Sequence, residues 1–253
     1  MITRKELQYY SSLLTKKYRK TENKFIVEGK KSVMEGLSSN YECTIVFVTN
    51  NFREENEELI VSINKEQKRI ETLKQKEFQK LSDTKTPQGI AAVFIKPKSE
   101  FLSTSFADDK IIVMMDNISD PGNLGTIIRN CDWFGIRNIL LSKDIVDYTS
   151  PKVIRSSMGS VFHENIFENI TVSDLNNLKA IGFEILCADT EGENIFSYQS
   201  EKKKLLILSS ESHGPSSEFE KITDEKITIP KIGDAESINV ASASAVLLAQ
   251  LTK

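Results

Sequence analysis

The residues with the most obvious chemical potential lie in the segment "KLLILSSESHGP", where an apolar run ends in hydroxyl, carboxyl and imidazole side chains. Ser212 stands beside His213 and two positions before Gly214, which suggests a serine nucleophile at a strand end. A nucleophile elbow also needs glycine two positions before the serine, and its histidine base comes later in the chain. Ser210 takes the place of that glycine, and no histidine comes after His213. The pattern argues against a serine hydrolase.

A second chemical possibility is dinucleotide binding by the loop "DPGNLG", which comes after an apolar run ending at Asp116. The loop does not match G-x-G-x-x-G, and no acidic residue ends the next apolar run, "NILLS", where a ribose would be held. A Rossmann oxidoreductase is therefore disfavoured. An α/β module that only binds a ligand stays open on these residues.

The elements that must position these loops alternate along the chain after residue 110. Apolar runs predict strands at 110–116, 138–142, 183–189, 204–209 and 226–230. Helical patterns lie between and after them, at 121–135, 151–162 and 239–251. Such alternation predicts an α/β fold, with a parallel sheet covered by helices on both faces. Ligands bind at the carboxyl ends of the strands in these sheets, so the loops after Asp116, Ser209 and Ile229 are the candidate binding loops.

The first hundred residues read as a smaller α/β unit. Strands are expected at 44–50 and 88–97, with a charged helical stretch at 54–68. The polar segment "KPKSEFLSTSFADDK" then reads as a linker. We therefore expect one domain over 1–100 and a second over 106–253.

Charge is distributed unevenly along the chain. The net charge is −3, yet residues 1–31 hold nine basic side chains against three acidic ones. Such a local excess can attract the phosphates of a nucleic acid, although a solvated helix face has the same composition. The candidate nucleic-acid contacts in this stretch are Lys16, Lys17, Arg19, Lys20 and Lys24.

Cysteine content and hydropathy exclude several other classes. Three widely spaced cysteines without a C-x-x-C pair argue against a disulfide framework and against a structural metal site. The chain shows neither an apolar leader nor a run long enough to span a membrane. A cytoplasmic protein is expected.

The loops after three predicted strands together resemble the motifs of the SpoU, or TrmH-like, branch of the SPOUT RNA methyltransferases. The first family motif, N-x-G-x-x-x-R, is matched by Asn123, Gly125 and Arg129, and the second by Glu211 with Gly214. The third, an I-P … S-L-N-V pattern, is matched by Ile229, Pro230, Ser237, Ile238, Asn239 and Val240. Three motifs in order at family spacing make the resemblance specific.

The N-terminal part carries a separate resemblance. The segments "LLTKKYRKTENKFIVEGKKSVMEGL" and "LSDTKTPQGIAAV" are similar to the RNA-gripping domain of many SpoU members, a small ribosomal-protein-like α/β/α unit. The likeness thus covers nearly the whole chain.

The resemblance implies a parallel sheet whose C-terminal segment forms a trefoil knot. It implies S-adenosylmethionine as cofactor, bound in the knot loops, and a homodimer through the knot region with the active site across the interface. The implied reaction is methylation of a ribose 2′-hydroxyl in rRNA or, less favoured, tRNA. No metal ion is implied.

The resemblance also implies roles for individual residues. Arg129 would hold an RNA phosphate and orient the hydroxyl, because a guanidinium with a pKa above about 12 is a poor base. The implied catalytic residues are Arg129, Asn123, Glu211, Ser237 and Asn239. The implied cofactor contacts are Ser209, Ser210, Gly214, Ile229, Ile238 and Asn239. Asn239 is also a candidate cap of the last helix.

Two positions depart from the family pattern. Ser209 and Ser212 stand where glycine is usual, and glycine permits a close approach of the backbone to a ligand. These serines motivate the alternative hypothesis of a SPOUT-fold RNA-binding protein with weakened catalysis.

Overall fold

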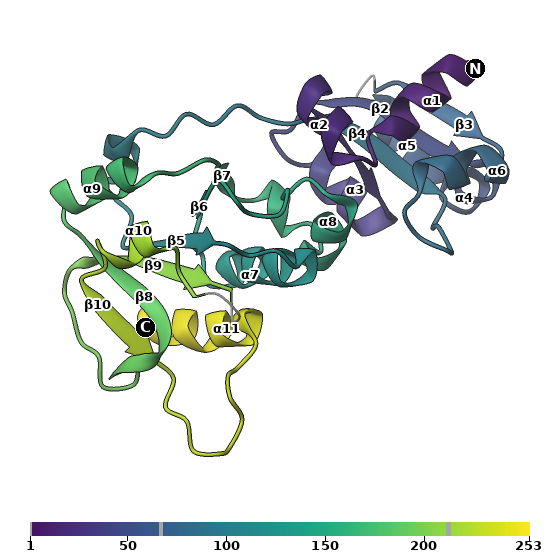
Figure 1. The fold of residues 1–253 in the computed structure, drawn as a ribbon. Coiled ribbons are helices and arrows are strands. Elements are labelled where there is room, and N and C mark those ends of the chain that lie inside the picture. The colour runs from purple at the N-terminus through teal and green to yellow at the C-terminus, as the bar shows by residue number, and fades with distance from the viewer. Residues whose placement is uncertain (1, 66–67, 211–213) are drawn as a thin grey trace. The chain divides into compact units, whose positions relative to one another are not determined.

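The chain folds into two compact units (Figure 1). The computed structural model describes residues 2–65, 68–210 and 214–253. One unit comprises 1–98 together with 147–162, and the other comprises 99–146 and 163–253. The expected division at 1–100 and 106–253 assigns residues 147–162 to the second domain, whereas in the structure this segment packs with the first unit.

The N-terminal unit is built on a four-stranded sheet in the order β1-β4-β2-β3. Strands β1 and β2 both pair antiparallel with β4, and β2 pairs parallel with β3. The helices and strands of this unit are α1 (Arg4–Ser12), α2 (Lys16–Glu22), β1 (Lys24–Glu28), α3 (Lys30–Leu37), β2 (Cys43–Thr49), α4 (Asn50–Glu55), α5 (Glu57–Lys65), β3 (Ile70–Leu73), α6 (Gln75–Phe78), η1 (Gln79–Leu81), β4 (Ile90–Ile95), α8 (Pro151–Ser157) and η3 (Ser160–Phe162). The predicted strands at 44–50 and 88–97 are confirmed as β2 and β4.

Aromatic packing explains why residues 147–162 belong to this unit. The ring of Phe162 lies 5.2 Å from that of Phe94 and 6.2 Å from that of Phe25. Gly36 of α3 permits this packing, because a Cβ there would stand 2.9 Å from the Phe162 ring. Tyr148, at the other end of the segment, is 1% exposed.

The C-terminal unit is built on six parallel strands in the order β10-β8-β9-β5-β6-β7. The parallel sheet predicted from alternating runs is therefore confirmed. The helices and strands of this unit are η2 (Ser103–Phe106), β5 (Ile111–Asp116), α7 (Pro121–Trp133), β6 (Asn138–Leu141), β7 (Asn165–Phe167), α9 (Val172–Ala180), β8 (Phe183–Asn194), β9 (Lys203–Ser209), α10 (Ser217–Glu220), β10 (Glu225–Thr228) and α11 (Val240–Leu251).

Helices cover both faces of the parallel sheet, as the sequence predicts. Ile112 and Met114 of β5 pack in one core with Leu175 and Leu178 of α9. Side chains alternate between the faces of a strand, so the buried Val113 and its neighbours point to the opposite face. Figure 1 shows α7 and α11 side by side in this unit, and α11 also contacts β9.

No helix in the part of the chain that the structure describes is long and apolar enough to cross a membrane.

Candidate active site

A cavity of about 450 Å³ opens in the C-terminal unit, beside the carboxyl ends of β9 and β10. Ligand pockets commonly fall between roughly 300 and 1,000 Å³. The described lining comes from residues 188–190, 208–210, 214–215, 227–233 and 235–238, with Val240, Ala243 and Leu247 of α11. Loops from two of the three motif segments thus meet at the edge where α/β sheets bind ligands.

The cavity brings together most of the predicted cofactor contacts. Its lining includes Ser209, Ser210, Gly214, Ile229 and Ile238. The predicted catalytic Ser237 lines it too, and is exposed. Glu211, Ser212 and His213 lie outside the described residues.

Backbone geometry shapes the loop after β9. Gly214 has a φ of 65°, in the left-handed region that glycine adopts without a steric penalty. Its N–H donates to the Ser210 carbonyl at 2.9 Å, which joins the two described ends of this segment. Ser209 ends β9 within the sheet, and its backbone pairs in register with Asp116 of β5.

The cavity wall is largely apolar and carries two carboxylates, Asp189 and Glu236, against the ammonium group of Lys231. Burial alone would raise the pKa of Asp189, but the hydrogen bond from Lys226 and the N–H of Glu191 hold it below its usual value. The Asp189 carboxylate lies 3.0 Å from the Lys226 ammonium group. Lys226 thus compensates the charge of Asp189, and the wall suits a ligand with a large apolar surface that the Glu236 carboxylate and the Lys231 ammonium group can contact.

Asp116 links the end of β5 to the loop after β9. Its side chain is buried, with 1% exposed, and its Oδ2 accepts the N–H of Ser216 at 2.7 Å. The sequence predicts Asp116 only as the end of a strand and assigns it no role. The sequence feature that could have pointed to this role is the acidic residue at the end of an otherwise apolar strand, because a buried carboxylate needs a hydrogen-bond or charge partner.

The first and third motifs are in direct contact. Asn239 donates its side-chain amide to Oδ1 of Asn123 at 3.1 Å. Oδ1 of Asn239 also accepts the N–H groups of Ala241 at 3.0 Å and Ser242 at 3.4 Å, so the predicted cap of the last helix is confirmed. Asn123 lies in the first turn of α7, and its N–H donates to Asp120, the N-cap residue.

A second amide joins the same two helices. Asn130 of α7 donates to the Ala241 carbonyl at 2.9 Å and to the Ser244 hydroxyl at 2.8 Å. Asn130 comes seven residues after Asn123, which is close to two helical turns, so both point toward α11. Asn130 was not predicted from the sequence, because the family motif marks its charged neighbour, Arg129, instead.

The Arg129 side chain does not share the face of α7 from which Asn123 and Asn130 reach α11. It lies six positions after Asn123, about 120° around the helix from it. Its side chain is exposed, and among the described residues nothing hydrogen-bonds to it or pairs with it. It is also absent from the described lining of the cavity. Within one chain, therefore, Arg129 and the cavity are not brought together.

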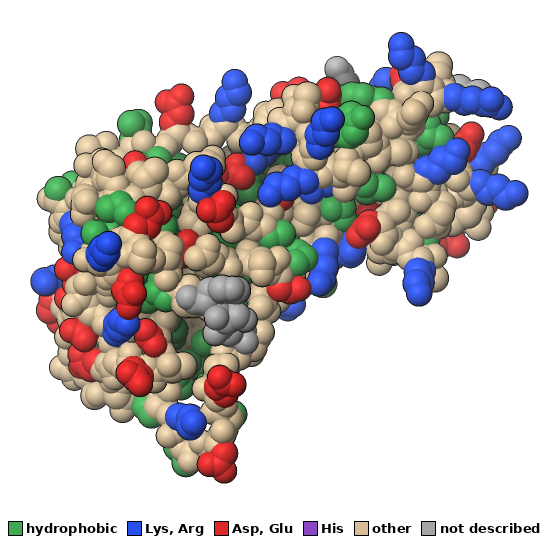
Figure 2. All heavy atoms as spheres, in the orientation of Figure 1, with side chains coloured by type: hydrophobic (Ala, Val, Ile, Leu, Met, Phe, Trp, Pro, Cys, Tyr) green, Lys and Arg blue, Asp and Glu red, His purple; other side chains and the backbone are tan. Residues whose placement is uncertain are grey.

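The predicted RNA-binding cations divide into two groups. Lys16, Lys17 and Lys20 are exposed on α2, and Lys24 is partly buried with its ammonium group 5.9 Å from the Tyr9 ring. Arg19 is different, because its side chain is only 6% exposed and pairs with Asp147 at 2.8 Å. The structure therefore removes Arg19 from the set available to RNA. On the face that Figure 2 shows, Lys and Arg side chains are more frequent than Asp and Glu side chains on the N-terminal unit.

A cluster of two carboxyl groups, of which only Glu164 is fully buried, lies at the end of α7 in the C-terminal unit. Asp132 contacts Nδ1 of His163 at 2.7 Å and Nη1 of Arg137 at 3.4 Å. The same Nη1 lies 3.3 Å from Glu164, whose side chain is fully buried. Burial raises the pKa of Glu164 to about 8, because the attraction of Arg137 offsets only part of the desolvation. At neutral pH the Glu164 carboxyl is therefore mostly protonated, and Asp132 balances the charge of Arg137.

In the described part of the chain, no group of three or more His, Cys, Asp or Glu side chains is arranged to hold a metal ion.

Comparison with protein families identifies both parts of the chain. Residues 110–249 match the SpoU rRNA Methylase family, and residues 4–92 match the MRM3-like substrate binding domain. The first match covers more than half of the chain.

Individual relatives agree with the family matches. The chain is 32% identical over 245 residues to the 23S rRNA (guanosine(2553)-2′-O)-methyltransferase RlmP of Bacillus subtilis, covering 96% of this chain and 94% of that protein. It is 26% identical to rRNA methyltransferase 3A, mitochondrial, of Danio rerio, and spans 64% of that longer protein.

Solved structures extend the likeness to the whole fold. A TrmH-family RNA methyltransferase structure from Porphyromonas gingivalis superimposes with a TM-score of 0.84 at 30% identity, covering 99% of this chain and 98% of that one. The SpoU methyltransferase AviRb from Streptomyces viridochromogenes, solved in complex with the cofactor AdoMet, gives a TM-score of 0.89 at 21% identity, covering 99% and 97%. At that identity the second match shows the fold alone.

Proposed function

Since the chain belongs to the SpoU rRNA methylase family, whose members depend on S-adenosylmethionine, we propose that it methylates a ribose 2′-hydroxyl in rRNA. One observation carries the proposal for this chain. The loops after β9 and β10 line one cavity, and Asn239, at the end of the second loop, is bonded to Asn123 of the first motif. The three segments that resemble the family motifs therefore converge at one edge of the sheet.

The cavity is the proposed cofactor site. The residues present fit S-adenosylmethionine, because the apolar wall suits its adenine and the exposed carboxylate of Glu236 suits its positive charges. The proposed contacts are Ser209, Ser210, Gly214, Ile229, Ile238 and Asn239. When bound, this cofactor supplies an electrophilic methyl group on a sulfonium. Ser209 lines the cavity as the end of a strand, where its backbone can contact a ligand as glycine would.

The protein's part in the reaction is alignment and removal of one proton. A bond between the ribose oxygen and the methyl carbon would replace the carbon–sulfur bond, with a neutral thioether leaving, and the hydroxyl proton would pass through the assembly of Arg129 and the RNA phosphate to solvent. Arg129 is proposed to hold an RNA phosphate and orient the hydroxyl. Asn123, Ser237 and Asn239 are proposed to supply neutral hydrogen bonds near the reacting groups, and Glu211 a further polar contact.

We further propose that the enzyme works as a homodimer. Exposed Arg129 has no partner among the described residues of its own chain, so a second copy can bring it to a cavity. An apolar patch on the same unit, formed by Phe196, Ala245, Val246 and Ala249, offers a surface for that contact. The family's trefoil knot is proposed for the loops around the cavity. Light scattering that gave a monomer at micromolar concentration would contradict the dimer.

The N-terminal unit is proposed to grip the RNA, and residues 106–253, without the 147–162 segment, to perform catalysis. The exposed lysines on α2 and the match to a substrate binding domain support this division. An rRNA substrate is favoured over tRNA because RlmP is a 23S rRNA methyltransferase and the family is one of rRNA methylases. The cytoplasm is the proposed location, where ribosomal RNA would be met.

Two measurements on the purified protein test the proposal. Calorimetric titration should show S-adenosylmethionine binding, and a tritium-transfer assay should show methylation of rRNA at a ribose 2′-oxygen. Absence of binding at millimolar cofactor, with RNA binding retained, would instead favour the RNA-binding protein with weakened catalysis. Mapping the ribose methylations lost from a deletion strain would identify the nucleotide.

A further inference from the structure

Helix α2 presents an aromatic ring among lysines on the surface of the N-terminal unit. Lys16, Lys17 and Lys20 are exposed, and Tyr18 between them has 46% of its surface exposed. None of these four side chains has a hydrogen bond, ion pair or ring contact to another residue that the structure describes. The helix therefore offers one ring and three positive charges to solvent.

Tyr18 differs from the other tyrosines of the chain in having no such partner. Tyr10 packs on Phe47 with ring centroids 5.1 Å apart, and Tyr198 donates its hydroxyl to Glu184 at 2.6 Å. Tyr9 donates to Glu22 at 3.1 Å, and Tyr148 is 1% exposed beneath Lys96. An exposed ring without an internal role is available to a ligand.

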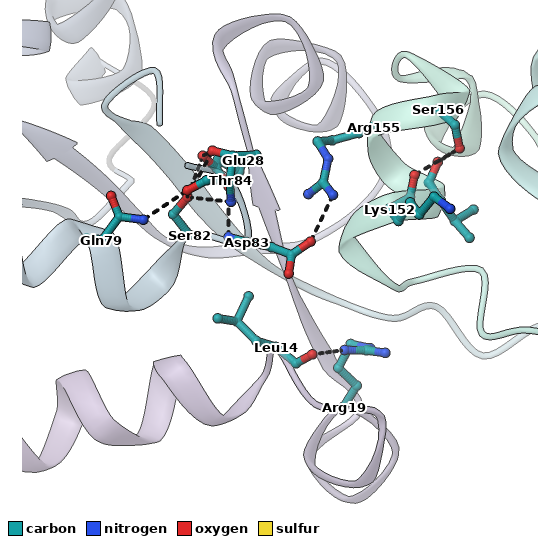
Figure 3. Close-up of polar contacts among 11 residues, drawn as sticks. Leu14, Arg19, Glu28, Gln79, Ser82, Asp83, Thr84, Lys152, Arg155 and Ser156 are labelled. Carbon is teal, nitrogen blue, oxygen red and sulfur yellow. Dashed lines mark hydrogen bonds and ion pairs between the residues drawn. The ribbon is translucent and has the colours of Figure 1, made fainter. Parts of the chain in front are cut away.

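The remaining basic side chain of α2, Arg19, fixes the helix through contacts on its buried side. Arg19 donates to Asp147 at 2.8 Å and to the carbonyls of Leu13 at 3.0 Å and Leu14 at 2.8 Å. Figure 3 shows Arg19 turned toward the Leu14 carbonyl. Because this cation is buried and fully used, it holds α2 in one orientation, and the positions on either side of it face outward.

The segment that holds Arg19 is itself fixed to the N-terminal unit. Asp147 begins the 147–162 segment, and Arg155 of α8 pairs with Asp83 at 2.8 Å (Figure 3). Burial alone would raise the pKa of Asp147, but Thr149 and Arg19 hold it below its usual value. Asp147 therefore stays ionised as the partner of Arg19 at neutral pH, which pre-organises the surface above it.

The one acidic side chain of α2, Glu22, is held away from the lysines and does not neutralise their charge. Glu22 accepts the Tyr9 hydroxyl, which directs its charge toward α1. Lysines suit phosphates, and an exposed ring suits the face of a base that is not already stacked in a helix. A double helix hides its base faces, so it can meet the lysines but not the ring.

From this arrangement we propose that Tyr18 is a stacking platform for an unpaired base of the substrate RNA, with Lys16, Lys17 and Lys20 holding the flanking phosphates. The inference rests on the proposed function and narrows its substrate to RNA that presents a single-stranded loop or bulge. The stacking contact is insensitive to base identity, because every base has a π-face. Sequence selection would then come from other contacts.

Binding of two RNA probes to the full chain tests the proposal. One probe is a hairpin with an unpaired loop, and the other is a blunt duplex with the same number of phosphates. The wild type should bind the hairpin more tightly. Tyr18→Ala and Tyr18→Leu should each weaken hairpin binding by about 5-fold to 150-fold, the range for one stacked base, and leave duplex binding unchanged. Tyr18→Phe should bind as the wild type does, because the ring is kept.

Two further variants separate stacking from charge and from general surface change. Lys20→Gln should weaken both probes alike and lower the salt dependence of binding by roughly one phosphate contact. Val61→Ala, which shortens a 52% exposed apolar side chain on α5 of the same unit, should change neither.

The outcomes distinguish this inference from the proposed function. Hairpin binding by Tyr18→Ala equal to the wild type, or an equal loss on both probes, would overturn the stacking role even if methylation persists. Cofactor affinity and methylation of the wild type, measured on the same preparation, report on the proposed function alone. Tyr18→Ala should keep the cofactor affinity of the wild type, since α2 and the cavity belong to different units.

Discussion

Asn123 and Asn239 stand 116 positions apart in sequence and are joined by a side-chain hydrogen bond of 3.1 Å. Asn123 lies in the first turn of α7 and Asn239 caps α11, so the bond joins the first turns of both helices. Substitution of either residue should therefore affect both the proposed site and the stability of the helices. Substitution of Asn239 should affect stability more, because Asn239 is also the N-cap of α11.

Replacing Asn239 separates capping from the contact with Asn123. Asn239→Ala should lower the free energy of unfolding by about 1 kcal/mol, the usual cost of a lost N-cap. Asn239→Ser keeps a capping oxygen but cannot reach Asn123, so it should preserve most of the stability and still lose methylation. Urea denaturation and a methyl-transfer assay measure the two effects. Full activity in Asn239→Ser would show that the contact with Asn123 is dispensable.

Arg129 should matter for transfer and not for cofactor binding. Arg129→Ala should reduce methylation by at least about 100-fold, as loss of a group that aligns developing charge does. Arg129→Lys should fall almost as far, because an ammonium group lacks the planar fork of a guanidinium. Calorimetry should show cofactor affinity close to that of the wild type. Lys221→Ala, another exposed cation of the same unit, is the matched control and should stay active.

Filling the cavity should block the cofactor. Ala243 of α11 lines the cavity, and Ala243→Phe places a phenyl ring there. Cofactor affinity should fall by about 10-fold or more, since overpacking of this kind costs about 1–3 kcal/mol. Ala243→Ser, a small change at the same place, should bind nearly as the wild type does. Equal affinity in Ala243→Phe would place the cofactor elsewhere.

The Glu164 carboxyl should make stability depend on pH. Its pKa rises from 4.5 to about 8 on folding, so the folded protein holds a proton that the unfolded chain releases. Stability is then greatest below pH 4.5 and falls as the pH rises toward 8. Glu164→Gln removes this dependence and should be more stable than the wild type by roughly 1–3 kcal/mol near pH 8.5, with little difference near pH 5.

Denaturation at both pH values measures this difference, and Glu201→Gln, an exposed carboxyl of the same unit, is the control. A loss of stability in Glu164→Gln at high pH would mean that the charged form is the favoured one. The wild type would then be stabilised by an ion pair between Glu164 and Arg137.

The parallel sheet was predictable because its strands are buried on both faces and therefore read as continuous apolar runs. The length of β8 was not. The sequence predicted a strand at 183–189, whereas β8 continues through the polar residues to Asn194, because β10 pairs along it. That pairing is a tertiary contact, which local composition does not record.

The burial of Arg19 could likewise not be predicted from the local sequence. Four lysines share its stretch of sequence, and the charge pattern treats all five cations alike. What distinguishes Arg19 is Asp147, which lies 128 positions later and is brought to it by the fold. The three loops of the site were predictable, because the spacing of motif residues can be read directly from the sequence, whereas tertiary contacts cannot. Their joining through Asn130 and Asp116 needed coordinates.

The 147–162 segment has a consequence for synthesis on the ribosome. The N-terminal unit cannot complete its aromatic core until Phe162 has emerged, because that ring packs against Phe25 and Phe94. Translation proceeds at about 5–20 residues per second, so a nascent chain complete to residue 98 waits roughly 3 to 13 s for its last core residues. The core of the N-terminal unit is therefore completed only after β5 and β6, two strands of the other unit's sheet, have been synthesised.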